Sequence, residues 1–213
     1  MRPLGSLKQQ AKDLFIDYYW PCVGASFVAA TILAALSVSS AGMLSLLLIP
    51  IFTFGKKMFF LTVYNSEKKD IGYMFSEGIR NYGHKLGGYL WSVLFTFLWS
   101  LLFIIPGIIK SFSYAMTPYL LSEYDNIPAR DALKVSMRMM KGNKGRLFVL
   151  YLSFIGWDIL SILTLGILNI FLVRPYKETA LSGFYQELKI ACILSGEFPE
   201  LIPEEAQTES TAE

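Results

Sequence analysis

The sequence predicts an all-α fold: a polytopic membrane bundle of about six transmembrane helices in three units, each an amphipathic helix followed by a helical hairpin. Two observations support this prediction. Of the 213 residues, 54% are hydrophobic and only 17% are charged, whereas soluble domains contain roughly 25% charged residues. The basic residues are also confined to alternate connections between the apolar stretches, as in membrane proteins. A soluble chain of this length has no interior large enough for so much apolar surface.

Six apolar stretches approach the roughly 20 residues that an α-helix needs to cross a bilayer. They are Trp20 to Ser37, Met43 to Tyr64, Leu86 to Ile105, Ile108 to Leu121, Leu147 to Leu163, and Ile167 to about Tyr185. Pro106 and Gly107 separate the third stretch from the fourth, because proline removes a helical donor and glycine permits a sharp turn. Cys22 to Leu36 also has the composition of a signal-peptide core, but the acidic residues Asp13 and Asp17 before it favour a retained helix.

The distribution of positive charge predicts the orientation in the membrane. Fourteen basic residues lie before the first stretch, between the second and third, between the fourth and fifth, and after the sixth. The other three connections, near Ser39, Pro106 and Leu165, carry none. Since cytoplasmic loops are enriched in Lys and Arg, we expect both termini and all the longer connections to be cytoplasmic.

An internal repeat relates the three units, which cover about residues 1–66, 67–123 and 124–190. Leu46 to Pro50 corresponds to Leu102 to Pro106 at an offset of 56 residues. Each unit begins with a segment in which apolar residues recur at helical spacing. These segments are Leu4–Tyr18, Ile71–Leu86 and Ala129–Met140. We expect them to lie in the cytoplasmic membrane interface.

The C-terminal end differs in composition from the rest of the chain. Residues 197–213 hold six Glu, two Pro and no Lys or Arg. A segment with so few apolar side chains cannot offset the entropy of ordering itself. We therefore expect residues 1–196 to form a single membrane domain and residues 197–213 to form a disordered, dispensable cytoplasmic tail.

Several motifs resemble one bacterial family. They are Trp99 to Lys110, Ser113 to Tyr119, Ser136 to Gly142, Leu152 to Trp157, Leu163 to Gly166, Pro175-Tyr176 and Phe184-Tyr185. Together they are similar to domain-of-unknown-function family 975, small multi-pass membrane proteins found widely in Gram-positive bacteria. The likeness is dense from about Tyr89 to Leu188. The resemblance implies an integral protein of the bacterial plasma membrane, and it supplies no catalytic residues.

Four charged residues are candidates for an intramembrane polar site: Lys110, Asp158, Arg174 and Glu178. At about 1.5 Å per residue, Arg174 lies about 12 Å from the turn at Gly166, close to the middle of the bilayer. A charge at that depth is costly, so we expect it to face the interior and to be held by Asp158, by Glu178 or by the carbonyls released at Pro175. Pro175 is expected to break the helix beside it, as at the polar sites of transporters. A purely structural ion pair explains the same residues.

Six basic residues are candidates for contacts with lipid headgroups: Arg130, Lys134, Arg138, Lys141, Lys144 and Arg146. Each cationic residue near an anionic membrane surface contributes roughly 1 kcal/mol, so anionic lipids are the expected partners. Ser26, Ala30 and Ala34 form a stripe of small residues, which suits close packing within the fold, against a second copy, or against another membrane protein. No basic patch has the pattern of a nucleic-acid-binding surface.

Enzyme signatures are missing from the sequence. His84 is the only histidine in the sequence, and it lies in a basic loop. Neither a Ser-His-Asp triad nor a metal site built from several histidines is therefore predicted. We expect no catalytic residues, no metal and no cofactor. Two functions remain: a non-enzymatic membrane protein that acts through lipid or membrane-protein contacts, or, alternatively, a small transporter or channel component with an intramembrane polar site.

Overall fold

The computed structural model describes residues 2–38, 42–67, 70–102, 104–125, 127–164, 166–196 and 198–201. Every regular element among these residues is helical, so the all-α prediction is confirmed. The helices are α1 (Leu4–Asp17), α2 (Tyr19–Val38), α3 (Gly42–Tyr64), α4 (Gly72–Ile79), α5 (Tyr82–Leu102), α6 (Ile104–Ser113), α7 (Thr117–Glu123), α8 (Ala129–Met139), α9 (Lys144–Leu152), α10 (Ile155–Leu163) and α11 (Arg174–Leu194). A π-helical segment, Asn169–Val173, leads into α11, and a 3-10 turn, Pro199–Leu201, follows it.

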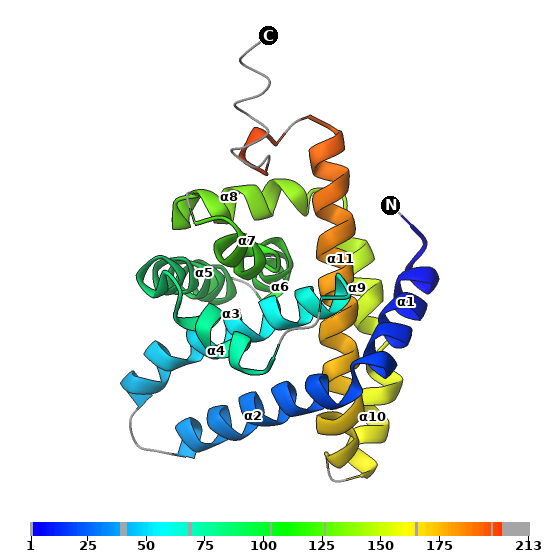
Figure 1. Ribbon diagram of the computed structural model, residues 1–213. Coiled ribbons are helices and arrows are strands. Elements are labelled where there is room, and N and C mark those ends of the chain that lie inside the picture. Colours follow the sequence, from blue (N-terminus) through cyan, green and yellow to red (C-terminus); the bar gives the residue numbers. More distant parts are fainter. Residues whose placement is uncertain are drawn as a thin grey trace.

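Pairs of antiparallel helices extend from the centre of the fold in different directions (Figure 1). α2 packs against α3, α5 against α6, and α10 against the π-helical segment before α11. In Figure 1, α2 and α3 extend to the lower left, whereas α10 and the first turns of α11 extend to the bottom. Long α11 runs from that lower end to the top of the view, so it connects the last hairpin to the centre of the fold.

A shorter amphipathic helix packs beside each hairpin. α4 contacts α3, α8 contacts α5 and α7, and α1 contacts α11. Because α4 and α8 each follow the hairpin that they contact in the chain, α1 takes the corresponding place beside the last hairpin. The N-terminal helix therefore joins the beginning of the chain to its end.

The amphipathic pattern explains how these helices pack. In α1 the buried residues are Leu7, Ala11 and Phe15, one turn apart, so they form a single stripe. α8 begins after Pro128, carries Asp131 in its first turn, and is followed by Gly142 at a φ of +80°. These are ordinary start and stop signals, and they gave the bounds of α8 to within one residue.

The predicted helix break at Pro175 is wrong. Arg174 and Pro175 follow the π-helical segment Asn169–Val173 without interruption, and the Arg174 N–H donates to the Asn169 carbonyl five residues earlier. The chain enters α11 through the wider π-helical turn, which accommodates the proline. The carbonyl of Pro175 itself accepts a hydrogen bond from Thr179 Oγ1 at 2.9 Å.

Among the described residues, one stretch is long and apolar enough to cross a membrane, Lys144–Leu163, which comprises α9 and α10. It contains the predicted span Leu147 to Leu163. Tyr19–Ile32 is apolar but shorter. The described helices therefore support a helical fold with apolar hairpins, and the number of membrane spans stays a prediction.

The predicted disordered tail needs a correction at its beginning. Phe198 is 7% exposed and Leu201 is fully buried, and both belong to the main hydrophobic core. Tyr124 donates a hydrogen bond to the Leu201 carbonyl at 3.0 Å, and Arg138 pairs with Glu200. The acidic average composition of residues 197–213 predicted disorder, although Phe198 and Leu201 within this segment are apolar. Residue 197 and residues 202–213 lie outside the described part of the chain.

Truncation tests this docking. A chain that ends at Ser195 is expected to lose about 3 kcal/mol of stability, because it gives up the burial of Phe198 and Leu201. A chain that ends at Leu201 keeps both anchors and serves as the control, with an expected stability equal to that of the full chain. Thermal unfolding in detergent measures both. Equal stability of the two truncated chains would contradict the docking.

Candidate functional site

Polar residues line one face of α11. Glu178, Ser182, Tyr185 and Lys189 recur at intervals of three and four residues, which places them on one side of the helix. Ser182 and Tyr185 are fully buried. Polar side chains in such surroundings need partners, and these come from α3 and α7.

The first partner is Lys56 on α3. Its Nζ lies 2.6 Å from Glu178 Oε1, and the side chains of Lys56 and Glu178 are only 25% and 17% exposed. The neighbouring Lys57 places its Nζ 4.6 Å from the centre of the Tyr119 ring on α7. Glu178 Oε2 is buried and makes no hydrogen bond within the described part of the chain. This ion pair joins α3 to α11 inside the fold.

The row continues toward the end of α11 through aromatic residues. The rings of Tyr119 and Tyr185 stack with centroids 4.6 Å apart. Tyr119 and Ser182 share a hydrogen bond of 3.4 Å. Tyr185 and Lys189 both donate to Glu123, each at 2.5 Å. Charged and aromatic side chains therefore connect α3, α7 and α11 in one network.

The structure does not bring the four predicted polar-site residues together. Asp158 pairs with Lys177 at 3.4 Å, and Glu178 pairs with Lys56. Lys110 lies with its Nζ 4.9 Å from the Trp99 ring centre and 3.8 Å from Met137 Sδ. Arg174 is exposed and forms no ion pair with any described residue.

The expected pairing of Arg174 with Asp158 or Glu178 is therefore wrong, and the π-helical turn explains why. The predicted depth of Arg174 assumed regular α-helical spacing from Gly166 onward. The segment Asn169–Val173 instead makes i→i+5 turns, which add residues to each turn and rotate the side chains that follow. Lys177 consequently faces Asp158, and the side chain of Arg174 is exposed on the surface.

The six candidate headgroup contacts divide into two groups. Arg130, Lys134, Arg138 and Lys141 are exposed on and after α8, whereas Lys144 and Arg146 are half-buried. Lys134 bonds to Asp131 at 2.8 Å, and this hydrogen bond together with the lysine charge lowers the pKa of Asp131. Arg138 pairs with Glu200, as described above. Arg130 and Lys141 form no ion pair with any described residue, so their charge is available at the surface.

A second ion-pair cluster escaped sequence reasoning. Arg2 Nε lies 2.8 Å from Glu187 Oε1, and Arg146 contacts the other carboxylate oxygen at 3.8 Å. Tyr64 donates to Gln10 at 3.0 Å beside them. The sequence signal was Glu187, a carboxylate just after the sixth apolar stretch. Its partner is 185 residues away in the chain, and no local pattern reveals such a pairing.

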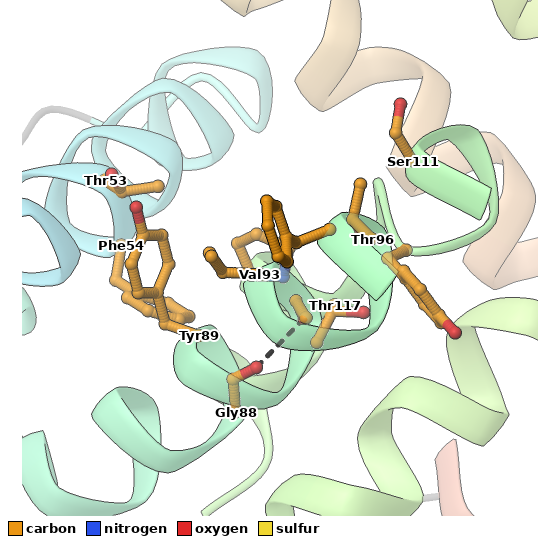
Figure 2. A pocket seen from close by; sticks show the side chains of 12 residues that line it. Thr53, Phe54, Gly88, Tyr89, Val93, Thr96, Ser111 and Thr117 are labelled. Carbon is orange, nitrogen blue, oxygen red and sulfur yellow. Dashed lines mark hydrogen bonds between the residues drawn. The ribbon is translucent and has the colours of Figure 1, made fainter. Parts of the chain in front are cut away.

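A cavity of about 440 Å³ lies between α3, α5 and the segment from α6 to α7 (Figure 2). Thr53 and Phe54 form one wall, and Thr117 forms part of the opposite one. Ser92 Oγ donates to the Gly88 carbonyl at 2.9 Å, which is the dashed bond in Figure 2. The described residues contain no group of three or more His, Cys, Asp or Glu that could hold a metal ion.

These observations define an all-helical protein with apolar hairpins and an internal polar network. A family model with the description "Protein of unknown function (DUF975)" matches residues 93–191, from the middle of α5 into α11. The resemblance inferred from the motifs is therefore confirmed over that part of the chain. No curated protein and no solved structure matches the chain.

Proposed function

We propose that the protein is a multi-pass integral protein of a bacterial plasma membrane, with both termini cytoplasmic, that acts without catalysis through contacts with lipids or other membrane proteins. The observation that carries this proposal is the apolar surface of the hairpin helices. On α5, seven large apolar side chains are 37–63% exposed: Leu90, Trp91, Val93, Leu94, Phe97, Leu98 and Trp99. Contiguous exposed patches of this kind mark surfaces that contact a membrane or another protein.

The last hairpin extends the same pattern. Ile162 and Leu163, at the end of α10, are 75% and 76% exposed. Between Asp158 and Arg174 the chain carries no charged residue. An exposed hairpin end of this composition is favourable in hydrocarbon and unfavourable in water. In the proposed location, these exposed apolar side chains contact lipid instead of water.

The cationic surface of α8 supports the part of the proposal that concerns lipids. Exposed Arg130, Lys134 and Lys141 give this surface a net positive charge beside the apolar hairpins. Basic residues beside an apolar segment bind anionic phospholipids through their phosphate groups. We therefore expect phosphatidylglycerol or cardiolipin to accompany the purified protein.

Exchange of these three residues for glutamine tests the lipid contact. Each charge contributes roughly 1 kcal/mol near an anionic surface, so retention of phosphatidylglycerol in nanodiscs should fall at least about tenfold. The matched control is the triple variant Arg130→Lys, Lys134→Arg, Lys141→Arg, which keeps the charge and should retain lipid like the wild type. Mass spectrometry of the co-purified lipids measures both. Equal retention by the glutamine variant would refute electrostatic lipid binding at α8.

A small transporter or channel component is the second candidate. The observation that favours it is the polar face of α11, where Glu178 Oε2 is buried without a hydrogen bond from any described residue. Unsatisfied carboxylate oxygens inside a membrane bundle are typical of sites that bind ions or solutes. Variants of Lys56 and Glu178, discussed below, separate this role from a structural one.

A further inference from the structure

The ammonium group of Lys110 on α6 has no counter-ion among the described residues. Its Nζ lies 3.8 Å from Met137 Sδ on α8 and 4.9 Å from the centre of the Trp99 ring on α5. A thioether sulfur is only a weak hydrogen-bond acceptor, and a ring face attracts a cation without offering it a conventional acceptor. Because Lys110 is half-buried, water hydrates only part of the side chain. An anion beside its Nζ would therefore gain a charge-assisted hydrogen bond.

Contacts between α6 and α8 place Lys110 at the cationic surface of α8. Besides the contact between Lys110 and Met137, Ser136 Oγ donates a hydrogen bond to the Ser113 carbonyl at 2.8 Å. Ser136 and Ser113 are both buried, so this bond holds the end of α6 against α8. In Figure 1, α8 lies above α7 and α6. Lys110 therefore belongs to the same surface as the basic residues of α8, although it comes from the preceding hairpin.

Positive charge exceeds negative charge around Met137. On α8, Lys134 precedes Met137 by three residues and Arg130 precedes it by seven, so these side chains lie on one side of the helix. Lys134 pairs with Asp131 at 2.8 Å, whereas Arg130 pairs with no described residue. Together with Lys110, they supply three positive charges against the one negative charge of Asp131. This excess favours an anionic occupant.

Apolar side chains are exposed next to the Lys110 ammonium. Ile108 and Ile109 on α6 are 51% and 47% exposed, and Trp99 is 37% exposed. Under the proposed membrane location, on which this inference rests, these side chains contact acyl chains. A free inorganic anion matches only the charge of this region. An anionic phospholipid matches both the charge and the apolar surface.

We propose that Lys110 and α8 together bind the phosphate of one anionic phospholipid molecule per chain. Lys110 Nζ donates a hydrogen bond to a phosphate oxygen beside Met137, and Lys134 and Arg130 add attraction from α8. The acyl chains extend along the exposed apolar side chains of α5 and α6. A zwitterionic headgroup brings its own ammonium, which the excess positive charge repels, so the site selects phosphatidylglycerol over phosphatidylcholine. The proposal assigns a half-buried ligand outside α8, which diffuse attraction to the exposed charges of α8 does not require.

Four probes identify the chemistry of the occupant. Dioleoylphosphatidylglycerol, dioleoylphosphatidylcholine, dioleoylglycerol and inorganic phosphate are each titrated into the detergent-purified full chain, and the thermal unfolding midpoint is followed. A ligand that binds only the folded state raises the midpoint. Phosphatidylglycerol should act at a concentration at least about tenfold lower than the other three. An equal response to phosphatidylcholine would overturn selection of an anionic headgroup, an equal response to dioleoylglycerol would overturn recognition of the phosphate, and an equal response to inorganic phosphate would overturn the lipid as its source.

Two substitutions of Met137 test the role of Lys110 without altering the lysine. Met137→Glu places a carboxylate within reach of Lys110 Nζ, because the Met137 sulfur already lies 3.8 Å from it. The lysine then has a counter-ion in the protein, and the carboxylate repels a phosphate. Met137→Gln has nearly the same shape and no charge. Half-saturation of Met137→Glu should therefore require at least about tenfold more phosphatidylglycerol than half-saturation of Met137→Gln. Equal requirements would overturn the site beside Met137.

Substitution of the lysine itself provides a second, independent test. Lys110→Gln should weaken phosphatidylglycerol binding at least about tenfold, so the proposal stays testable if Met137→Glu misfolds. Lys12→Gln is the matched control, because Lys12 is an exposed lysine on α1, another amphipathic helix. It removes the same charge and should leave binding unchanged. Wild-type binding by Lys110→Gln, or an equal loss in Lys12→Gln, would show diffuse attraction and overturn the site.

Failure of this inference is distinguishable from failure of the proposed function. If the protein resists extraction from membranes by alkaline carbonate but Lys110→Gln binds phosphatidylglycerol like the wild type, only the assignment of Lys110 is wrong. If carbonate extracts the protein, the membrane location is wrong, and the contact with acyl chains is wrong with it.

Discussion

Replacing Gly55 with alanine should strongly reduce the amount of folded protein. A Cβ atom at Gly55 would lie 1.9 Å from the carbonyl oxygen of Met74 on α4. Because that oxygen belongs to the backbone, no side-chain rotation relieves the contact, and the two helices have to separate. Overpacking of this kind costs about 3 kcal/mol, near the upper end of the usual range. The midpoint of thermal unfolding and the monodisperse yield in detergent measure the loss.

Gly156→Ala is the matched control. Gly156 also lies within a helix, and a Cβ atom there meets no other heavy atom within 4 Å. The added methyl should be neutral or stabilise the protein by up to about 1 kcal/mol, because alanine favours helix more than glycine. Gly78→Ala provides an independent check of the same contact, since its Cβ would lie 2.3 Å from the Ile51 carbonyl oxygen. If Gly55→Ala behaves like Gly156→Ala, the close packing of α3 on α4 is wrong.

Replacing Lys56 with methionine should cost about 3 kcal/mol of stability. The substitution keeps an unbranched side chain of similar length and removes the charge that neutralises Glu178 at 2.6 Å. A largely buried carboxylate without a partner is strongly unfavourable. The double variant Lys56→Met, Glu178→Leu removes both charges and should recover most of the loss, because a well-packed apolar pair can replace a buried ion pair. Unfolding of the two single variants and the double variant gives the coupling between the residues.

Arg174→Leu is the control for this series, and it should fold as well as the wild type. Arg174 is exposed and pairs with no described residue, so nothing inside the fold loses a partner. The series also separates the two proposed functions. A transporter with a site at Glu178 requires the double variant to fold but to lose solute binding, whereas a structural ion pair requires only that stability recover. Equal stability of Lys56→Met and the wild type would contradict the ion pair itself.

Local features of the fold could be predicted from the sequence. The bounds of α8 followed from Pro128, Asp131 and Gly142, and the helical spacing of apolar residues over Leu4–Tyr18 predicted α1. Both rely on interactions within one or two turns of helix, which the order of residues determines directly. The motifs from Trp99 onward identified the family that matches residues 93–191.

The partners of the charged residues could not be predicted in the same way. Glu178 and Lys56 are 122 positions apart, and their pairing depends on how α3 packs on α11. The position of Arg174 depended on the π-helical turn Asn169–Val173, which changes the rotation of the chain without a distinctive residue pattern. A single additional residue in a turn shifts each following side chain by about 100° around the helix. The membrane depth and direction of a side chain, when counted in residues from a turn, are therefore predicted less reliably than the order of the helices.

The anchors of the C-terminal segment were missed for a different reason. Phe198 and Leu201 stand among acidic residues and prolines, so average composition predicted disorder. The burial of these two side chains in the main hydrophobic core outweighs that average, because each buries a large apolar area. Arg138 contributes as well, since its guanidinium lies 4.9 Å from the centre of the Phe198 ring.

The proposed function requires that apolar hairpins insert into a membrane from the cytoplasmic side, with both termini remaining there. Paired alkaline phosphatase and green fluorescent protein fusions after Ser40 and after Asn143 test it most directly in intact bacterial cells. Basic residues are absent near Ser40 and abundant around Asn143, so the positive-inside rule places these points on opposite sides. We expect phosphatase activity after Ser40 and fluorescence after Asn143. Fluorescence without phosphatase activity at both positions would contradict it.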